Sequence, residues 1–282
     1  MNRSEQVAGW VSSALLVPRA AWLSARAPKD WRAGWEQYWG NVRSTGVGGD
    51  VLWDTGDLEE ASTYVDLARS HLDRSIPLVD VGCGNGRFTR RLGPLFTETI
   101  GVDLSANAVA RARTESAGQV GLSFRTMDVT AGGAGTDLAA SIGRDANVFV
   151  RGVFHVLEPA DRVVAARNLR AIVGGAGRVL LAETNFPGSK LEYLRHLGAS
   201  PRHIPAPLQR AMSDIPAPGH FGAPERRAAF PESEWSVVDD GVTDILTIPL
   251  HDRAGPAAAP ECIPGYYAIL EPADRPSDPI AG

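Results

Sequence analysis

The chain has 282 residues, of which 44% are hydrophobic and 22% are charged, and its formal net charge is −5. These values are typical of a globular protein with a large core, built as one elaborated domain or two small ones. The negative charge, without a lysine- or arginine-rich block, argues against a nucleic-acid partner. No apolar stretch is long enough to predict a membrane span. The two cysteines, Cys83 and Cys262, are too few for a disulfide framework and fit a cytoplasmic location.

The N-terminal region is rich in tryptophan and is predicted to be helical. Apolar residues within 7–17 recur at helical spacing and predict a helix that ends at Pro18. A secretion signal is the alternative for this stretch, but Glu5 lies in its would-be basic region. Six of the seven tryptophans lie in the first 53 residues. Asp30 is a predicted N-cap for a helix with one aromatic stripe, formed by Trp31, Trp35, Tyr38 and Trp39. This stripe packs on the core, closes over a ligand as a lid, or meets a second copy of the chain in a homodimer.

A buried strand followed by three glycines lies at residues 76–86. The apolar run over 76–81 lacks a polar face, which predicts a parallel strand buried on both sides. Gly82, Gly84 and Gly86 follow it, and a helical pattern comes next. Such a strand, turn and helix bring backbone N–H groups towards a ligand. A dinucleotide-binding motif would have its third glycine or an alanine at position 87, where this chain has Arg87.

Carboxylates end the next two predicted strands. The second strand, over 99–103, ends at Asp103, which can accept hydrogen bonds from both ribose hydroxyls of a nucleoside. Ser105 is predicted to cap the following helix, which leaves Asp103 free for a ligand. A third strand over 122–128 ends at Asp128, which either contacts a ligand or caps the loop before Thr130. With two more strands at 146–151 and 178–184, the alternation with helices predicts a doubly wound, mostly parallel α/β sheet.

The G-x-G-x-G spacing behind Asp80 resembles the first motif of class I S-adenosylmethionine (SAM)-dependent methyltransferases. That resemblance implies a Rossmann-like fold, SAM as the cofactor and S-adenosylhomocysteine as its product. It implies that Asp128 reaches the adenine amine while the adjacent backbone N–H contacts the ring. The residues implied to bind the cofactor are Asp80, Gly82, Cys83, Gly84, Gly86, Asp103, Leu104, Asp128, Val129 and Arg151.

The segment before the first strand carries a looser resemblance. Tyr38-Trp39 and the stretch over 46–56 resemble the entry of small-molecule methyltransferases of the thiopurine, thiol and halide type. In that group an aromatic residue closes over the bound SAM, which implies substrate-side roles for Trp39 and Trp53. Val51-Leu52 stand where the group has a proline before the tryptophan, so this chain departs from the subgroup pattern.

The end of the fourth strand suggests the chemistry. It has no Asn/Asp-Pro-Pro-aromatic run and no acidic pair for Mg²⁺, so we expect a metal-independent reaction. Arg151 either meets the SAM carboxylate or an anionic substrate, or forms a structural ion pair. His155 is either a general base or a histidine that satisfies backbone groups at a helix start. The irregularly spaced histidines after residue 185 do not predict a metal site, and His220 is assigned to the substrate side.

The predicted organisation has five parts: 1–57 as a helical tryptophan-rich lid, 58–184 as the SAM-binding core, 185–234 as an inserted substrate cap, 235–272 as strands completing the sheet, and 273–282 as a disordered tail. The predicted function is in-line methyl transfer from SAM to a small-molecule acceptor, a natural product being one candidate. Three alternatives stay open. They are a nicotinamide-dependent oxidoreductase, which Arg87 opposes, a SAM-binding cyclase or pericyclic catalyst, and a catalytically silent partner subunit.

Overall fold

The computed structural model describes residues 16–55, 58–248 and 260–274. Its centre is a seven-stranded sheet in the order β3-β2-β1-β4-β5-β7-β6. The strands are β1 (Leu78–Val81), β2 (Thr99–Asp103), β3 (Leu122–Thr126), β4 (Asn147–Arg151), β5 (Val179–Thr184), β6 (Trp235–Thr247) and β7 (Glu261–Pro272). The first five are parallel, and β7 runs antiparallel between β5 and β6. This arrangement confirms the predicted mostly parallel, doubly wound α/β sheet.

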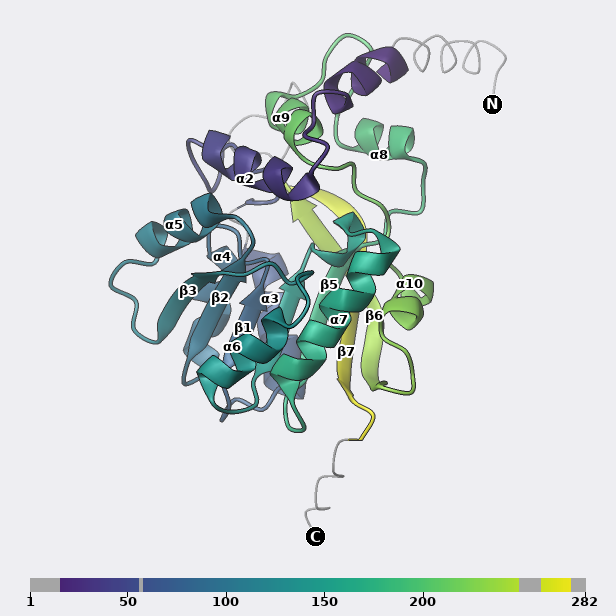
Figure 1. Cartoon of the computed structure of the whole chain (residues 1–282). Helices are drawn as coiled ribbons and strands as arrows, with labels where there is room; N and C mark the ends of the chain where they lie inside the picture. Colours follow the sequence, from purple (N-terminus) through teal and green to yellow (C-terminus); the bar gives the residue numbers. More distant parts are fainter. Residues whose placement is uncertain (1–15, 56–57, 249–259, 275–282) are drawn as a thin grey trace.

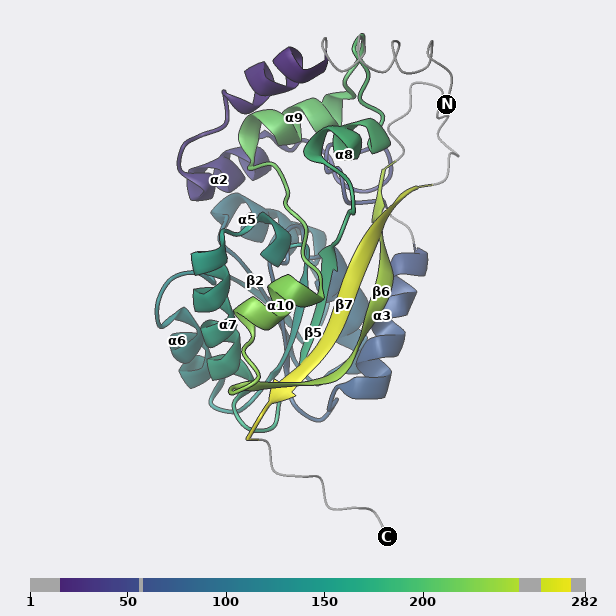
Figure 2. The same ribbon diagram turned by 90° about the vertical axis from the view of Figure 1, so that its right-hand side faces the viewer.

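Helices cover both faces of the sheet. They are α3 (Leu58–His71), α4 (Arg87–Leu92), α5 (Ala106–Glu115), α6 (Ala134–Ile142), α7 (Pro159–Val173) and α10 (Ala223–Ala229). Figure 2 shows α3 on one side of the sheet and α6 and α7 on the other. Alternate residues of β1 divide accordingly, with Leu78 in one buried cluster and Val79 in the other. Because both faces of the sheet are covered, every residue of β1 is buried, as expected for a central parallel strand.

Four helical segments lie above the carboxyl ends of the parallel strands (Figure 1). They are residues 16–24, α2 (Trp31–Asn41), α8 (Lys190–His196) and α9 (Ala206–Asp214). Asp30 caps α2 by accepting a hydrogen bond from the Arg32 N–H, as predicted. The prediction that Pro18 ends a helix is wrong, since residues 16–24 are helical. Most of the stretch over 7–17 lies outside the described residues, as does the predicted tail from residue 275 onwards.

One element boundary differs from the sequence prediction for a local reason. β3 ends at Thr126, two residues before Asp128, because the Asp128 side chain accepts a hydrogen bond from the Thr130 N–H and turns the chain. Helix α7 begins at Pro159, because proline lacks the amide hydrogen that a first helical turn leaves unpaired. Within the described residues, no helix combines the length and apolar character needed to cross a membrane.

Candidate active site

A cavity of about 440 Å³ lies between the carboxyl ends of the strands and the helical segments above them. Ligands of doubly wound sheets bind at this edge, because loops and helix N-termini converge there. The glycine turn and the ends of β2 and β3 form one half of the lining, with Gly82, Cys83, Gly84, Asp103, Leu104, Asp128 and Val129. The sheet edge and the segments above it form the other half, with Leu191, Tyr193, Leu197, Leu208, Met212, Ile215, Ile245 and Ile263.

Neighbouring side chains lie so close to the glycine turn that residues with side chains would not fit at Gly82 or Gly84. Gly84 has a φ of +54°, and a Cβ atom there would lie 2.8 Å from Cζ2 of Trp39. Gly82 has a φ of +74°, and a Cβ atom there would lie 2.4 Å from Cγ2 of Val153. Glycine at both positions therefore lets Trp39 and Val153 pack against the turn. The N–H groups of the turn are used within the protein, since those of Gly82 and Cys83 donate to the Val102 carbonyl and that of Gly84 donates to Asp103.

Two residues predicted to bind the cofactor lie just outside the cavity lining. Asp80 accepts a hydrogen bond of 2.5 Å from the Thr89 hydroxyl, and burial raises its pKa to about 7. Gly86 packs beneath the turn, where a Cβ atom would lie 2.8 Å from the Phe124 ring. Both residues therefore shape the glycine turn from behind rather than face the cavity.

Asp103 lines the cavity, and each of its carboxylate oxygens accepts one hydrogen bond from within the protein. One carboxylate oxygen accepts from the Gly84 N–H and the other from the Ser105 N–H, both at 2.9 Å. Burial raises the pKa of Asp103 to about 6, in spite of these two hydrogen bonds. Each oxygen keeps one lone pair, so the carboxylate fits two neighbouring hydroxyls such as those of a ribose. Ser105 caps α5, as predicted, by accepting from the Ala108 N–H.

Asp128 and Val129 line the cavity beyond Asp103. The Asp128 carboxylate accepts hydrogen bonds of 2.6 Å from Nε of Arg32 and from the Thr130 hydroxyl. Burial opposes its ionisation, but the bonds from Thr130 and Arg32 outweigh burial and lower the pKa of Asp128. The site therefore presents an ionised acceptor beside the apolar Val129, which suits an exocyclic amine on a flat ring.

The aromatic residues of α2 and the following segment form one cluster over the glycine turn. Tyr38 stacks on Trp53 with ring centroids 5.4 Å apart, and Trp35 meets Trp53 edge to face at 5.7 Å. Trp39 is buried and lies against Gly84. Trp35, Trp39 and Trp53 all line the cavity. The predicted roles of Trp39 and Trp53 thus have the required position, although the aromatic cluster is also part of the core.

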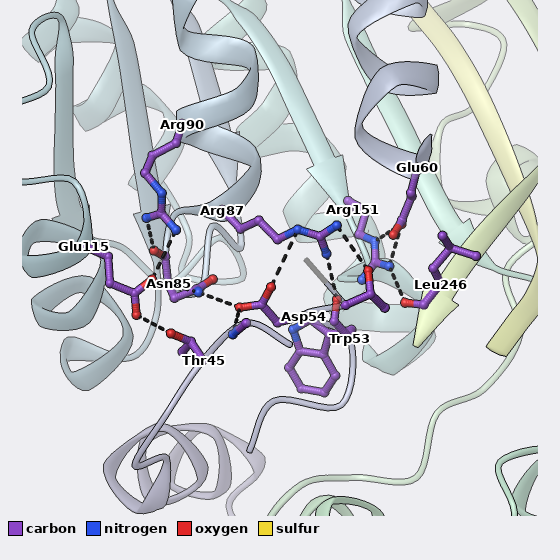
Figure 3. Close-up of polar contacts among 12 residues, drawn as sticks. Thr45, Trp53, Asp54, Glu60, Asn85, Arg87, Arg90, Glu115, Arg151 and Leu246 are labelled. Atoms are coloured by element: carbon purple, nitrogen blue, oxygen red, sulfur yellow. Dashed lines mark hydrogen bonds and ion pairs between the residues drawn. The ribbon is translucent and has the colours of Figure 1, made fainter. Parts of the chain in front are cut away.

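Arg87 fastens this aromatic segment to the glycine turn (Figure 3). Its guanidinium donates to the Trp53 carbonyl at 3.1 Å and lies 3.6 Å from the Asp54 carboxylate. Asp54 also accepts a hydrogen bond of 2.9 Å from Nδ2 of Asn85. From the sequence, Arg87 is only a departure from a dinucleotide motif, and its partners more than 30 residues earlier leave no local signal.

Arg151 forms a structural ion pair, which is one of the two roles that the sequence analysis allows for it. Its Nε and Nη2 atoms donate to Oε1 of Glu60 at 2.9 and 2.6 Å, as Figure 3 shows. Its side chain is only 7% exposed, and that of Glu60 is fully buried. Burial disfavours the charge, but Glu60 and Tyr64 outweigh burial and raise the pKa of Arg151. Arg151 borders the cavity with its guanidinium committed to Glu60.

His155 is held by a buried carboxylate that sequence reasoning missed. Oε2 of Glu183 lies 2.7 Å from Nδ1 of the imidazole, and Glu183 is fully buried. Glu183 also accepts from the backbone N–H groups of Val153, Phe154 and His155 at 2.8 to 3.1 Å. Because an ionised carboxylate only accepts hydrogen bonds, Nδ1 carries the hydrogen, and Nε2 is the ring atom left to take up a proton. His155 lines the cavity, so this pair can act on a bound molecule.

His220 does not reach the cavity. Its side chain is 63% exposed, and Nε2 lies 3.2 Å from Oε1 of Glu225. The structure therefore separates His220 from the substrate side to which the sequence assigned it, because the chain after α9 carries it out to the surface. Among the described residues, no three His, Cys, Asp or Glu side chains gather closely enough to hold a metal ion.

Comparisons with known proteins agree with this geometry. A family model described as a methyltransferase domain matches residues 79–179, which include the glycine turn, Asp103, Asp128 and His155. The chain is 29% identical over 210 residues to methyltransferase nsrG of Aspergillus novofumigatus, covering 72% of this chain and 77% of that protein.

Solved structures extend the similarity to most of the chain. A SAM-dependent methyltransferase from Anabaena variabilis matches with a TM-score of 0.73 and 26% identity, covering 87% of this chain and 96% of that chain. The fold is also that of magnesium protoporphyrin IX methyltransferase from Synechocystis PCC 6803, solved with bound S-adenosylhomocysteine, at a TM-score of 0.50 and 14% identity, covering 84% of this chain and 92% of that chain. These findings favour SAM over a nicotinamide cofactor, identify residues 79–179 as a methyltransferase domain, and support a class I SAM-dependent methyltransferase.

Proposed function

We propose that the enzyme methylates a hydroxyl group of an apolar small molecule, without a metal ion, and that His155 is the general base. The observation that carries this proposal is the His155–Glu183 pair at the cavity, with 2.7 Å between Nδ1 and Oε2. A hydroxyl group needs such a base, because its proton must leave as the oxygen attacks. A thiolate would need no base, so the buried pair favours a hydroxyl acceptor.

The charge distribution around the cavity supports an acceptor without a positive charge. The acidic residues of the lining are Asp54, Asp103 and Asp128, all of which lie beside the glycine turn or the ends of β2 and β3. The half formed by α8, α9 and the sheet edge is mainly apolar. An amine cation would lose its hydration there without a carboxylate to replace it, whereas an aromatic or aliphatic alcohol would not.

Different residues contribute to different parts of an in-line displacement. SAM, when bound, supplies the methyl group on a positively charged sulfur. Nε2 of His155 accepts the hydroxyl proton, and the Glu183 carboxylate stabilises the imidazolium that results. The apolar side chains of α8 and α9 exclude water, which strengthens the electrostatic interactions within the site. The two free cysteines are compatible with a cytoplasmic enzyme.

The test is to incubate the protein with SAM and a panel of apolar phenols, alcohols, thiols and amines. Formation of S-adenosylhomocysteine and of a methylated product would be followed by mass spectrometry. His155→Gln should lower turnover of a hydroxyl acceptor about 10²- to 10⁴-fold, the usual contribution of a general base. His220→Gln is the matched control, because its exposed histidine also pairs with a glutamate, and it should keep full turnover.

Three results would contradict the proposal. Full activity of His155→Gln on a hydroxyl acceptor would remove His155 from the reaction. Product formation without S-adenosylhomocysteine would indicate non-methyl chemistry on a SAM-binding fold. Binding of SAM without turnover of any acceptor class would indicate a catalytically silent subunit.

A further inference from the structure

Helix α2 reaches the end of β3 through one side chain, Arg32. Its Nε atom donates to Oδ2 of Asp128 at 2.6 Å, and its Nη2 atom donates to the Thr130 hydroxyl at 2.6 Å. The Thr130 hydroxyl in turn donates to Oδ1 of Asp128, also at 2.6 Å. The guanidinium fork therefore closes a ring of hydrogen bonds around one carboxylate, although Arg32 and Asp128 are 96 residues apart.

This ring fixes the direction in which Asp128 can accept another hydrogen bond. Oδ1 already accepts from both the N–H and the hydroxyl of Thr130. Oδ2 accepts only from Arg32 among the described residues, so one acceptor position is left, on that oxygen. Asp128 lines the cavity, whereas Arg32 and Thr130 are not among the residues that line it.

We propose that Arg32 is a positioning residue that makes the enzyme selective for adenine. Arg32 holds the Asp128 carboxylate ionised and in one orientation, so that one acceptor position on Oδ2 faces the cofactor base. An exocyclic amine can donate a hydrogen bond to this position, whereas a carbonyl oxygen cannot. The inference rests on Asp128 facing the adenine of SAM. It is independent of the acceptor and of His155, because it concerns binding of the cofactor alone.

The exposure of the ion pair indicates where the effect will be seen. The side chains of Arg32 and Asp128 are 40% and 24% exposed, so the pair adds little to the stability of the fold. Its effect is on geometry. Nε of Arg32 holds Asp128 and Nη2 holds Thr130, so the Asp128 carboxylate is fixed in one orientation. Removing the fork lets Asp128 turn away or take up a proton, and either change relieves its repulsion of a carbonyl oxygen.

The experiment is calorimetric binding of S-adenosylhomocysteine and of its hypoxanthine analogue, in which a carbonyl replaces the exocyclic amine. The wild-type protein should prefer the adenine form by on the order of 10- to 100-fold, the effect of one lost hydrogen bond to a charged group. Arg32→Gln should lower this preference about tenfold. Arg32→Lys should give an intermediate value, because an ammonium group cannot reproduce the fork.

Two controls make the result specific. Arg43→Gln removes another arginine, just after α2, that also pairs with an aspartate, Asp50 at 3.6 Å, and it should leave the preference unchanged. Asp128→Asn tests the premise, because an amide can accept from the amine or donate to the carbonyl, and it should abolish the preference. If Arg32→Gln does not fold, Arg32→Lys and Thr130→Val, which removes the second anchor of the fork, carry the test.

The outcomes separate the possible failures. A preference lowered in Asp128→Asn but unchanged in Arg32→Gln would overturn the role of Arg32. An unchanged preference in Asp128→Asn, or no preference in the wild-type protein, would overturn the premise and the inference with it. Neither result would bear on the proposed methylation of a hydroxyl, which is measured with acceptors.

Discussion

The Asp80 carboxylate accepts its hydrogen bond from Thr89 in a place closed to solvent, directly behind the glycine turn. The pair ties the end of β1 to α4, so the turn that faces the cavity is held from below by a buried acid. Burial raises the pKa of this acid to about 7, and the hydrogen bond from Thr89 opposes that rise only in part.

The stability of the ligand-free protein should therefore depend on Asp80 near neutral pH. A carboxyl whose pKa is raised in the folded state stabilises the fold below its unfolded pKa, and this stabilisation is lost as the pH rises through about 7. Between pH 5 and pH 8 the wild type should lose about 2–3 kcal/mol of unfolding free energy relative to Asp80→Asn. Chemical denaturation at each pH measures the difference. Parallel curves for the two proteins would show that Asp80 does not titrate in this range.

Asp103 should supply part of the binding free energy of the cofactor. Asp103→Ala should weaken binding of SAM and S-adenosylhomocysteine by about 1–3 kcal/mol, the effect of losing two charge-assisted hydrogen bonds. Calorimetry gives the affinities, and NAD should not bind. Asp66→Ala on the exposed face of α3 is the control, since its side chain is 74% exposed. An unchanged affinity in Asp103→Ala would refute the assignment of the ribose site.

The contact between Gly84 and Trp39 should be needed for cofactor binding. Gly84→Ala would place a Cβ atom 2.8 Å from Cζ2 of Trp39, at a backbone φ of +54°. Gly118→Ala is a matched control, because Gly118 has a φ of +82° with nothing within 4 Å of its Cβ position. Both variants should lose about 1–2 kcal/mol of stability to the left-handed backbone, as measured by thermal unfolding.

Only Gly84→Ala should also lose affinity for S-adenosylhomocysteine. Binding should change the tryptophan fluorescence of the wild type, because Trp39 lies on the glycine turn, and the change should be smaller in Gly84→Ala. Equal affinities in the two variants would show that the ligand does not depend on the close approach of Trp39.

Turnover should not require a metal ion. The observation behind this prediction is the end of β4, where Arg151 and Gly152 stand in place of an acidic pair and Arg151 is committed to Glu60. Treatment with a chelator followed by desalting should leave the rate of methyl transfer intact. Loss of activity that added Mg²⁺ restores would refute the prediction.

Features that depend on neighbours in the sequence were predictable. The apolar run into Gly82 predicts β1 because a strand buried on both faces has no polar alternation. The N-caps at Asp30 and Ser105 were found because a cap and its partner N–H lie two or three residues apart. Asp103 was found for the same reason, since the end of a strand can be read from the strand itself.

Features that depend on distant partners were not predictable. Glu183 is 28 residues from His155, and only the pairing of β4 with β5 brings the two together. The ion pair of Arg151 with Glu60 spans 91 residues, so the sequence left the role of Arg151 open. His220 shows the opposite error, because its position in the insertion gave no information on which way its side chain points.

The position of β7 has a consequence for synthesis of the chain on the ribosome. β6 lies at one edge of the sheet and, among the residues that the structure describes, pairs only with β7, although it precedes β7 in the sequence. β6 therefore has no place in the sheet until β7 has emerged and inserted beside β5. Ile245 of β6 and Ile263 of β7 both line the cavity. The part of the cavity wall that these two strands supply can therefore form only after the glycine turn and its carboxylates have been translated.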